Sequence, residues 1–116
     1  MRTVVLGIET QKDVARRILA TARNQRKAGD DRISFESAGE LWRVLAHPNA
    51  WEIVRAMTGA GPLTIREVAR RVGRDFKAVH SDVTMLANTG VVQRTDSGAV
   101  EFPYDRVHVE FDILAA

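Results

Sequence analysis

The chain has 116 residues, which is enough for one domain with a single modest core. Its residues are 45% hydrophobic and 6% aromatic, a balance typical of a helical or mixed globular domain rather than a disordered chain. It has no cysteine, which excludes disulfides, cysteine–zinc fingers and thiol catalysis and fits a reducing cytoplasm. The early apolar run over residues 4–6 is too short for a signal peptide or a membrane span.

Charge is distributed unevenly along the chain, although the net charge is only +2. Residues 66–80 carry five basic and two acidic side chains, a net charge of +3. Residues 101–116 carry one basic and four acidic side chains, a net charge of −3. The basic stretch is therefore the candidate for a polyanionic partner.

The first third of the chain predicts a strand over 2–9 and a helix over 11–27. The inward residues of the strand are Val4, Leu6 and Ile8, and those of the helix include Val14 and Ile18. The sequence AGDDR (28–32) stops the helix, because glycine can end a helix and aspartates favour turns. We place a domain boundary there, with residues 1–31 as an N-terminal extension and residues 32–116 as the main domain.

The middle of the chain predicts a short strand, RISFE, followed by four helices. Two capping boxes, Ser37 with Glu40 and Thr64 with Glu67, mark the starts of the first and third helices. Pro48 suits the first turn of the second helix. The apolar residues expected on the buried faces include Leu41, Trp42, Val44, Leu45, Trp51, Val54, Met57, Val68, Phe76, Val79, Val83 and Leu86.

The last quarter predicts a hairpin and a final strand. VVQRT and AVEF are expected to be strands joined by the turn Asp96-Ser97-Gly98. RVHVEFDI then alternates, with apolar residues on one side of a final strand. The fold class expected from this order of elements is α+β.

The third and fourth helices have the spacing of a helix-turn-helix. Ala69 lets two helices cross closely, Gly73 makes the tight turn, and Val79 wedges the second helix onto the first. The outer face of the fourth helix is formed by short polar residues that suit entry into a DNA major groove. The predicted DNA contacts are Lys77, Ala78, His80, Ser81, Thr84 and Asn88 on that helix, Arg70, Arg71 and Arg74 at the helix end and turn, and Arg94, Thr95 and Ser97 on the hairpin.

The pattern TIREVARRVGRDFKAVHSDVTMLANTGVVQR, within residues 37–102, resembles winged-helix transcriptional regulators of the MarR and ArsR type. More narrowly, residues 32–113 are similar to a family of small prokaryotic DNA-binding proteins that are often encoded beside a toxin. The resemblance implies a winged helix-turn-helix with a recognition helix at about 75–88 and a wing at 91–102. It also implies that the protein represses its own operon as an antitoxin, with double-stranded DNA and a cognate toxin as partners.

A protein-interaction module that neutralises a toxin and binds DNA only weakly is the alternative. An enzyme is not expected, because His80, Ser81 and Asp82 point in different directions on a helix. The three histidines fall in separate elements, so neither a metal nor a cofactor is expected. The N-terminal segment should pack on the final strand, and we favour packing across the two-fold axis of a homodimer. The predicted dimer or partner interface comprises Val4, Leu6, Ile8, Val14, Ile18, Val109 and Phe111.

Overall fold

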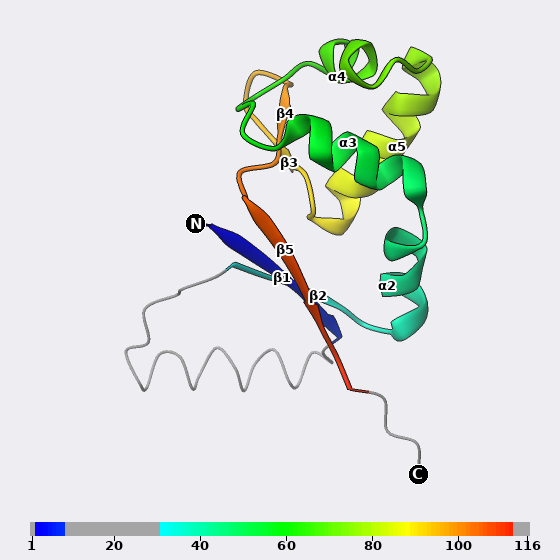
Figure 1. The fold of residues 1–116 in the computed structure, drawn as a ribbon, viewed down its shortest axis with the longest axis vertical. Helices are drawn as coiled ribbons and strands as arrows, with labels where there is room; N and C mark the ends of the chain where they lie inside the picture. Colours follow the sequence, from blue (N-terminus) through cyan, green and yellow to red (C-terminus); the bar gives the residue numbers. More distant parts are fainter. Residues whose placement is uncertain (1, 9–30, 113–116) are drawn as a thin grey trace.

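The computed structural model describes residues 2–8 and 31–112 of the chain (Figure 1). In that part it has a parallel sheet, four helices and a small antiparallel hairpin, so the α+β class is confirmed. The elements are β1 (Thr3–Ile8), β2 (Asp31–Phe35), α2 (Ala38–Leu45), α3 (Pro48–Met57), α4 (Ile65–Val72), α5 (Phe76–Thr89), β3 (Gln93–Arg94), β4 (Val100–Glu101) and β5 (Arg106–Glu110). The predicted helix over 11–27, with Val14 and Ile18, lies outside the described residues. No helix of the described residues is long and apolar enough to cross a membrane.

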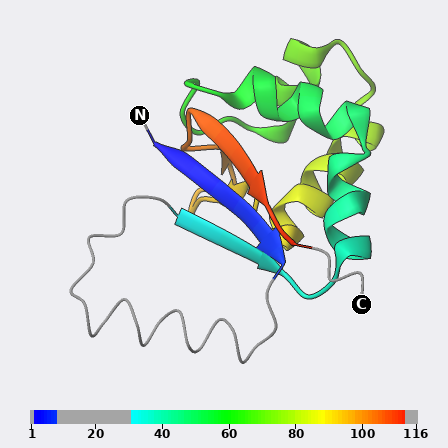
Figure 2. The same ribbon diagram turned by 60° about the horizontal axis from the view of Figure 1, so that its bottom comes forward.

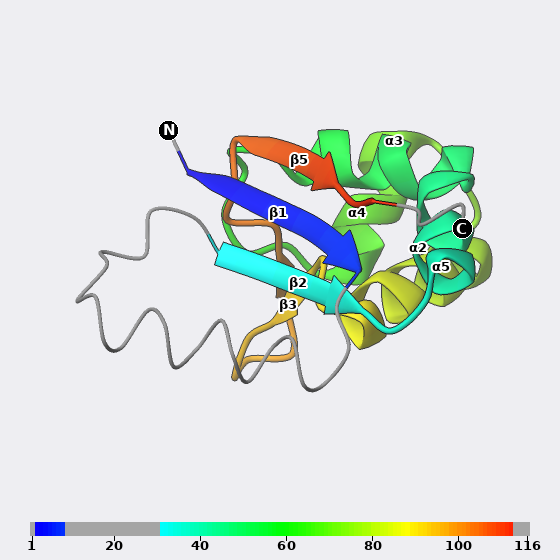
Figure 3. The same cartoon turned by 90° about the horizontal axis from the view of Figure 1, so that it is seen from below.

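The sheet joins the two ends of the described chain. Its strand order is β2-β1-β5, and both pairings are parallel. Leu6 in the central strand pairs with Ile33 on one side and Val109 on the other. The helices pack on one side of these three adjacent strands (Figures 2 and 3). Val4 and Leu6 point into the core that the sheet shares with the helices, and both are fully buried.

The expectation that the first strand packs on the last is confirmed, but the favoured cross-subunit version is wrong for β1. Thr3 to Gly7 of β1 pair with Arg106 to Glu110 of β5 within one chain. Val4 and Leu6 are 0% exposed in a single chain, so the described residues of that chain already cover two members of the predicted dimer or partner interface. Ile8, Val109 and Phe111 are only half-buried. The apolar alternation correctly indicated a covered face, but it did not indicate which chain covers it.

Gly7 lets an ion pair cross the outer face of the sheet. The Arg32 guanidinium on β2 reaches over the central strand to the Glu110 carboxylate on β5. A Cβ atom at Gly7 would lie 3.0 Å from an Arg32 nitrogen and 3.1 Å from the backbone oxygen of Glu110. Hydrogen bonds from Arg32 and His108 hold the pKa of Glu110 below its usual value. A glycine in the middle strand therefore allows the two edge strands to be linked.

α2, α3 and α4 begin where the sequence predicts, and α2 and α4 have the two expected side-chain caps. Ser37 accepts from the Glu40 backbone N–H at 3.2 Å, and Thr64 accepts from the Glu67 N–H at 3.1 Å. The reciprocal half of the second capping box is absent, because the Glu67 carboxylate binds arginines instead. His47 caps α3 through Nδ1, which accepts from the Ala50 N–H at 3.2 Å. Histidine is an uncommon cap, so the sequence did not indicate this one.

Two aromatic residues predicted to be buried are exposed. The exposed fraction of Trp42 is 52% and that of Phe76 is 37%. Trp42 makes an edge-on contact with Phe111, with 6.2 Å between ring centroids. Phe76 lies between the Arg66 guanidinium and the His80 ring. Helical periodicity identified the correct side of each helix but overestimated the width of its buried stripe.

Candidate nucleic-acid interface

α4 and α5 form a closely packed helix pair joined by a tight turn. Gly73 ends α4 with φ 68°, in the left-handed region that favours glycine. The Arg74 N–H donates to the carbonyl of Ala69 at 3.2 Å, which closes the turn. Asp75 then caps α5 by accepting from the Ala78 N–H. Ala69 and Val79 are 6% and 0% exposed, so the predicted small-residue, turn and wedge positions have the packing that the sequence indicates.

The outer face of α5 is polar and accessible. Val79, Val83 and Leu86 form its inward stripe and are 0% exposed. The predicted contact residues lie away from that stripe: Lys77, His80, Ser81 and Asn88 are exposed, and Ala78 and Thr84 are half-buried. Lys77 makes no ion pair with any residue of the described ranges. This face therefore offers one free cation and several short side chains with hydrogen-bonding groups.

Arg70 and Arg71 at the end of α4 share a single carboxylate, that of Glu67. Arg70 Nε donates to Glu67 at 2.8 Å, a second Arg70 nitrogen also contacts it, and Arg71 Nε donates at 3.2 Å. The Arg70 and Arg71 hydrogen bonds lower the pKa of Glu67 to about 2. Because this folded-state pKa lies below the ordinary value of 4.5, the stabilisation is present above about pH 4.5 and is lost as pH falls toward 2. Two predicted phosphate contacts are thus partly neutralised.

Arg74 belongs to a second ionic cluster, with Asp82 of α5 and His47 at the start of α3. Arg74 donates to Asp82 at 2.9 Å, and His47 Nε2 lies 3.4 Å from the other Asp82 oxygen. The Asp82 side chain is only 13% exposed and that of Arg74 is 23% exposed. Asp82 therefore faces the helix pair rather than solvent, and it ties the turn and the start of α3 to the middle of α5.

The hairpin is attached to the segment before α4. β3 and β4 pair antiparallel, and Leu63 pairs with Val100 through backbone hydrogen bonds of 2.8 and 2.7 Å. At the tip, the Thr95 and Ser97 hydroxyls lie 3.0 Å apart, and Gly98 has φ 85°. The predicted hairpin turn is thus confirmed. These pairings attach the hairpin strands to the segment that leads into α4.

The hairpin also contacts the end of α5 directly. An Arg94 guanidinium nitrogen on β3 donates to Asn88 Oδ1 on α5 at 3.2 Å. Both residues are exposed, so Arg94 and the α5 face belong to one continuous surface. The sequence did not indicate this contact, because Asn88 and Arg94 lie in different elements, α5 and β3.

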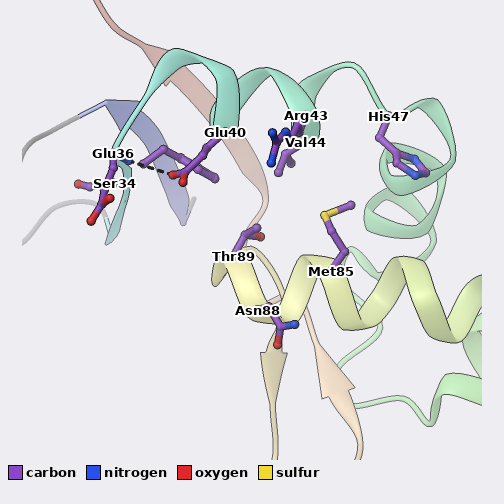
Figure 4. Close-up of a pocket in the computed structure, with 10 residues that line it drawn as sticks. Ser34, Glu36, Glu40, Arg43, Val44, His47, Met85, Asn88 and Thr89 are labelled. Atoms are coloured by element: carbon purple, nitrogen blue, oxygen red, sulfur yellow. Dashed lines mark hydrogen bonds between the residues drawn. The ribbon is translucent and has the colours of Figure 1, made fainter.

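A half-open groove of about 740 Å³ lies between α2 and the C-terminal half of α5 (Figure 4). Val44 and Arg43 of α2 project toward Met85 of α5 across this space. Asn88 is also among the lining residues, and its amide oxygen accepts from Arg94. In the described part of the chain, no group of three histidine or acidic side chains could hold a metal ion.

Residues 45–109 match the family model HVO_A0114, and this match spans more than half of the chain. The chain belongs to the HVO_A0114 family. The matched region contains α3, α4, α5 and both hairpin strands, together with most of β5. All twelve predicted DNA contacts of this HVO_A0114 chain, which fall between residues 70 and 97, therefore lie inside the family's shared region. No curated protein matches the sequence.

Proposed function

We propose that this HVO_A0114 protein is a sequence-specific, double-stranded DNA-binding transcriptional regulator. The proposed DNA-binding unit is a winged helix-turn-helix in which α5 is the recognition helix and the β3–β4 hairpin is the wing. The observation that carries the proposal is the continuous outer surface from Lys77 along α5 to Arg94, joined by the Asn88–Arg94 hydrogen bond. A core helix needs only an apolar stripe, and this helix adds an accessible face of short polar side chains.

The size and chemistry of the α5 face suit the major groove of DNA. That groove is about 12 Å wide and admits one α-helix, provided that the facing side chains are short. Ser81 and Thr84 have hydroxyls that can donate to or accept from base edges. Lys77, one turn earlier, is free to contact a backbone phosphate. The two hydroxyls would therefore contribute to sequence preference, and Lys77 to general affinity.

The hairpin supplies the second proposed contact. Arg94 lies on β3 and reaches Asn88 near the end of α5, and Thr95 and Ser97 lie at the hairpin tip. Arginine at such a position suits either a phosphate or a narrow minor groove. Two of the three arginines near the end of α4, Arg70 and Arg71, share the Glu67 carboxylate. Lys77 and Arg94 are therefore expected to dominate the electrostatic contribution to DNA affinity.

A finer assignment follows from the sequence resemblance to MarR and ArsR regulators and to toxin-linked DNA-binding proteins. On this basis we extend the proposal to an autorepressing antitoxin that acts in the cytoplasm as a homodimer. A dimer would present two α5 helices to the two halves of an inverted-repeat operator. These half-sites lie about one turn of the DNA duplex apart. Among the described strands β2 and β5 form the edges of the sheet, and these edges are candidate sites for such a contact.

One observation favours the alternative of a toxin-neutralising interaction module. Trp42 on α2 is 52% exposed and packs edge-on against the half-buried Phe111 after β5. Exposed aromatic side chains of this kind are enriched at protein–protein interfaces. Because this surface is distinct from the α5 face, a single chain could use both.

The proposed roles can be tested by comparing operator and random duplexes. We expect Arg94→Ala to weaken binding to both duplexes by similar factors, because Arg94 contacts the backbone. Ser81→Ala should weaken operator binding by roughly three- to tenfold and leave random DNA almost unchanged. Fluorescence anisotropy with the DNA upstream of the gene and a shuffled duplex measures both effects.

The matched control is Arg55→Ala, which removes an exposed arginine from the last turn of α3. Arg55 is outside the proposed surface, so its variant should bind both duplexes almost like the wild type. Equal losses for Arg94→Ala and Arg55→Ala would refute the proposed role of the hairpin. A uniform loss for Ser81→Ala would refute base contact by Ser81.

A further inference from the structure

Tyr104 lies where the hairpin region meets the parallel sheet. It is 4% exposed and its ring packs edge-on against Phe102, with 5.4 Å between centroids. Its hydroxyl donates to Asp31 Oδ2 at 3.0 Å and accepts from Gln93 Nε2 at 3.3 Å. Asp31 begins β2 and Gln93 begins β3, so one hydroxyl joins an edge strand of the sheet to a hairpin strand.

The sheet side of this contact is itself held by several interactions. The Arg2 guanidinium donates to Asp31 Oδ2 at 2.9 Å and lies 5.0 Å from the centroid of the Tyr104 ring. The Arg2 N–H donates to Asp105 Oδ2 at 2.7 Å, and the Asp105 N–H donates back to the Arg2 carbonyl at 2.7 Å. The segments before β1, at the start of β2 and before β5 therefore meet at Tyr104.

The hairpin depends on outside contacts for its position. β3 and β4 have two residues each, and isolated two-stranded ribbons are marginally stable in water. In the described part of the chain, its other attachments include the burial of Val100 in the hydrophobic core, the Leu63–Val100 pairing and the exposed Asn88–Arg94 hydrogen bond. A mostly buried hydroxyl with two partners is costly to leave unsatisfied, so the Tyr104 contact resists separation of hairpin and sheet.

The Tyr104 hydroxyl keeps its proton at neutral pH. Burial, followed by the hydrogen bond to Asp31, raises the pKa of the Tyr104 phenol above its ordinary value. The hydroxyl can therefore donate to the Asp31 carboxylate throughout the physiological range and still accept from Gln93.

We infer that Tyr104 is a positioning residue that fixes the hairpin on the ends of the parallel strands and thereby holds Arg94 against the end of α5. The role assigned to Arg94 rests on the proposed DNA binding. The mechanical coupling between sheet and hairpin does not depend on it. Gln93 is the residue directly before Arg94, so a shift of the Gln93–Tyr104 contact moves the proposed DNA-binding arginine with it.

Tyr104→Phe tests this inference, because it keeps the ring that packs on Phe102 and faces Arg2 and removes only the hydroxyl. Hydrogen exchange of backbone amides in the full-length protein is the first measurement. The amides of Thr95, Gly98 and Val100, which donate hydrogen bonds within the hairpin or to Leu63, should exchange about fivefold faster than in the wild type. Amides in the interior of α3 should change by less than twofold.

The matched control is Thr58→Val, which removes the hydroxyl that donates to the Val54 carbonyl at the end of α3. It deletes one local hydroxyl hydrogen bond in α3, whereas Tyr104→Phe deletes two hydrogen bonds that join the sheet to the hairpin. Its hairpin amides should exchange at the wild-type rate. Hairpin exchange in Tyr104→Phe that equals the wild-type rate, or that rises by the same factor in hairpin and α3, would overturn the inference.

Duplex binding separates this inference from the proposed function. If the wild type binds DNA, Tyr104→Phe should weaken binding by a smaller factor than Arg94→Ala, and the combined variant should lose little more than Arg94→Ala alone. Fully additive losses would overturn the coupling. If the wild type binds no DNA, the proposed function fails, and the exchange measurement alone decides whether Tyr104 positions the hairpin.

Discussion

Replacing Ser81 with glutamate is expected to lower DNA affinity by at least about a hundredfold, since like charges juxtaposed across an interface cost several kcal/mol. Ser81 is exposed on α5 and makes no side-chain contact that the fold requires, so the free energy of unfolding should change by less than about 0.5 kcal/mol. The carboxylate would enter the groove between the phosphate backbones, which repel a negative charge. Fluorescence anisotropy with a duplex of about 30 base pairs measures the loss.

Ser81→Gln is the matched control for this prediction. It has nearly the size of glutamate but no charge, so the difference between the two variants isolates the electrostatic effect. We expect the glutamine variant to lose no more than about tenfold in affinity, through its larger size alone. If both variants bind DNA as the wild type does, the outer face of α5 is not the DNA-binding surface.

Leu6→Ala is expected to lower the free energy of unfolding by about 2–5 kcal/mol, the range for removing a buried leucine. Leu6 is 0% exposed at the centre of β1, between two strands and beneath the helices. Since small domains have only about 5–15 kcal/mol of stability in total, this is a large fraction. Urea denaturation followed by circular dichroism measures the change.

Trp42→Ala is the comparison for this variant, because Trp42 is large but 52% exposed. It should lower the free energy of unfolding by less than about 1.5 kcal/mol, since much of its surface already contacts water. A Leu6→Ala protein with wild-type stability but an altered oligomeric state would contradict the structure. It would indicate that Leu6 lies at a subunit interface and not in the core of one chain.

The helices and the hairpin could be predicted from sequence because their signals are local. Ser37, Thr64 and Asp75 stand directly before apolar residues spaced three and four apart, which marks three helix starts. Gly73 and Gly98 stand where the chain needs a positive φ, so both turns were correctly placed. Each of these features is decided by residues fewer than about ten positions apart.

The sheet and its register could not be predicted in the same way. Val4 pairs with Val107, about a hundred residues along the chain, and no local pattern specifies that partner. Alternation showed that β1 and β5 each have an apolar face, which fits pairing within a chain and pairing between chains equally well. The choice depends on how the connecting segments run in space.

The candidate site was predicted in outline but not in its ionic contacts. The spacing of Glu67 to Arg70 and Arg71, three and four residues, is a local signal for ion pairs on a helix and was available in the sequence. By contrast, the contacts of Asp82 with His47 and of Tyr104 with Asp31 join residues 35 and 73 positions apart. These contacts arise only from tertiary packing, which brings residues that are distant in the sequence together.

Binding of DNA as a function of salt concentration tests the central claim most directly. Each phosphate contact contributes about −0.9 to the slope of log affinity against log salt concentration. With Lys77 and Arg94 as the free cations and Arg70, Arg71 and Arg74 partly paired, we predict a slope between about −2 and −4.5 per protomer. A fluorescence-anisotropy series from 50 to about 300 mM salt measures it. Binding with a slope near zero, or no binding at the lowest salt concentration, would contradict DNA binding by this surface.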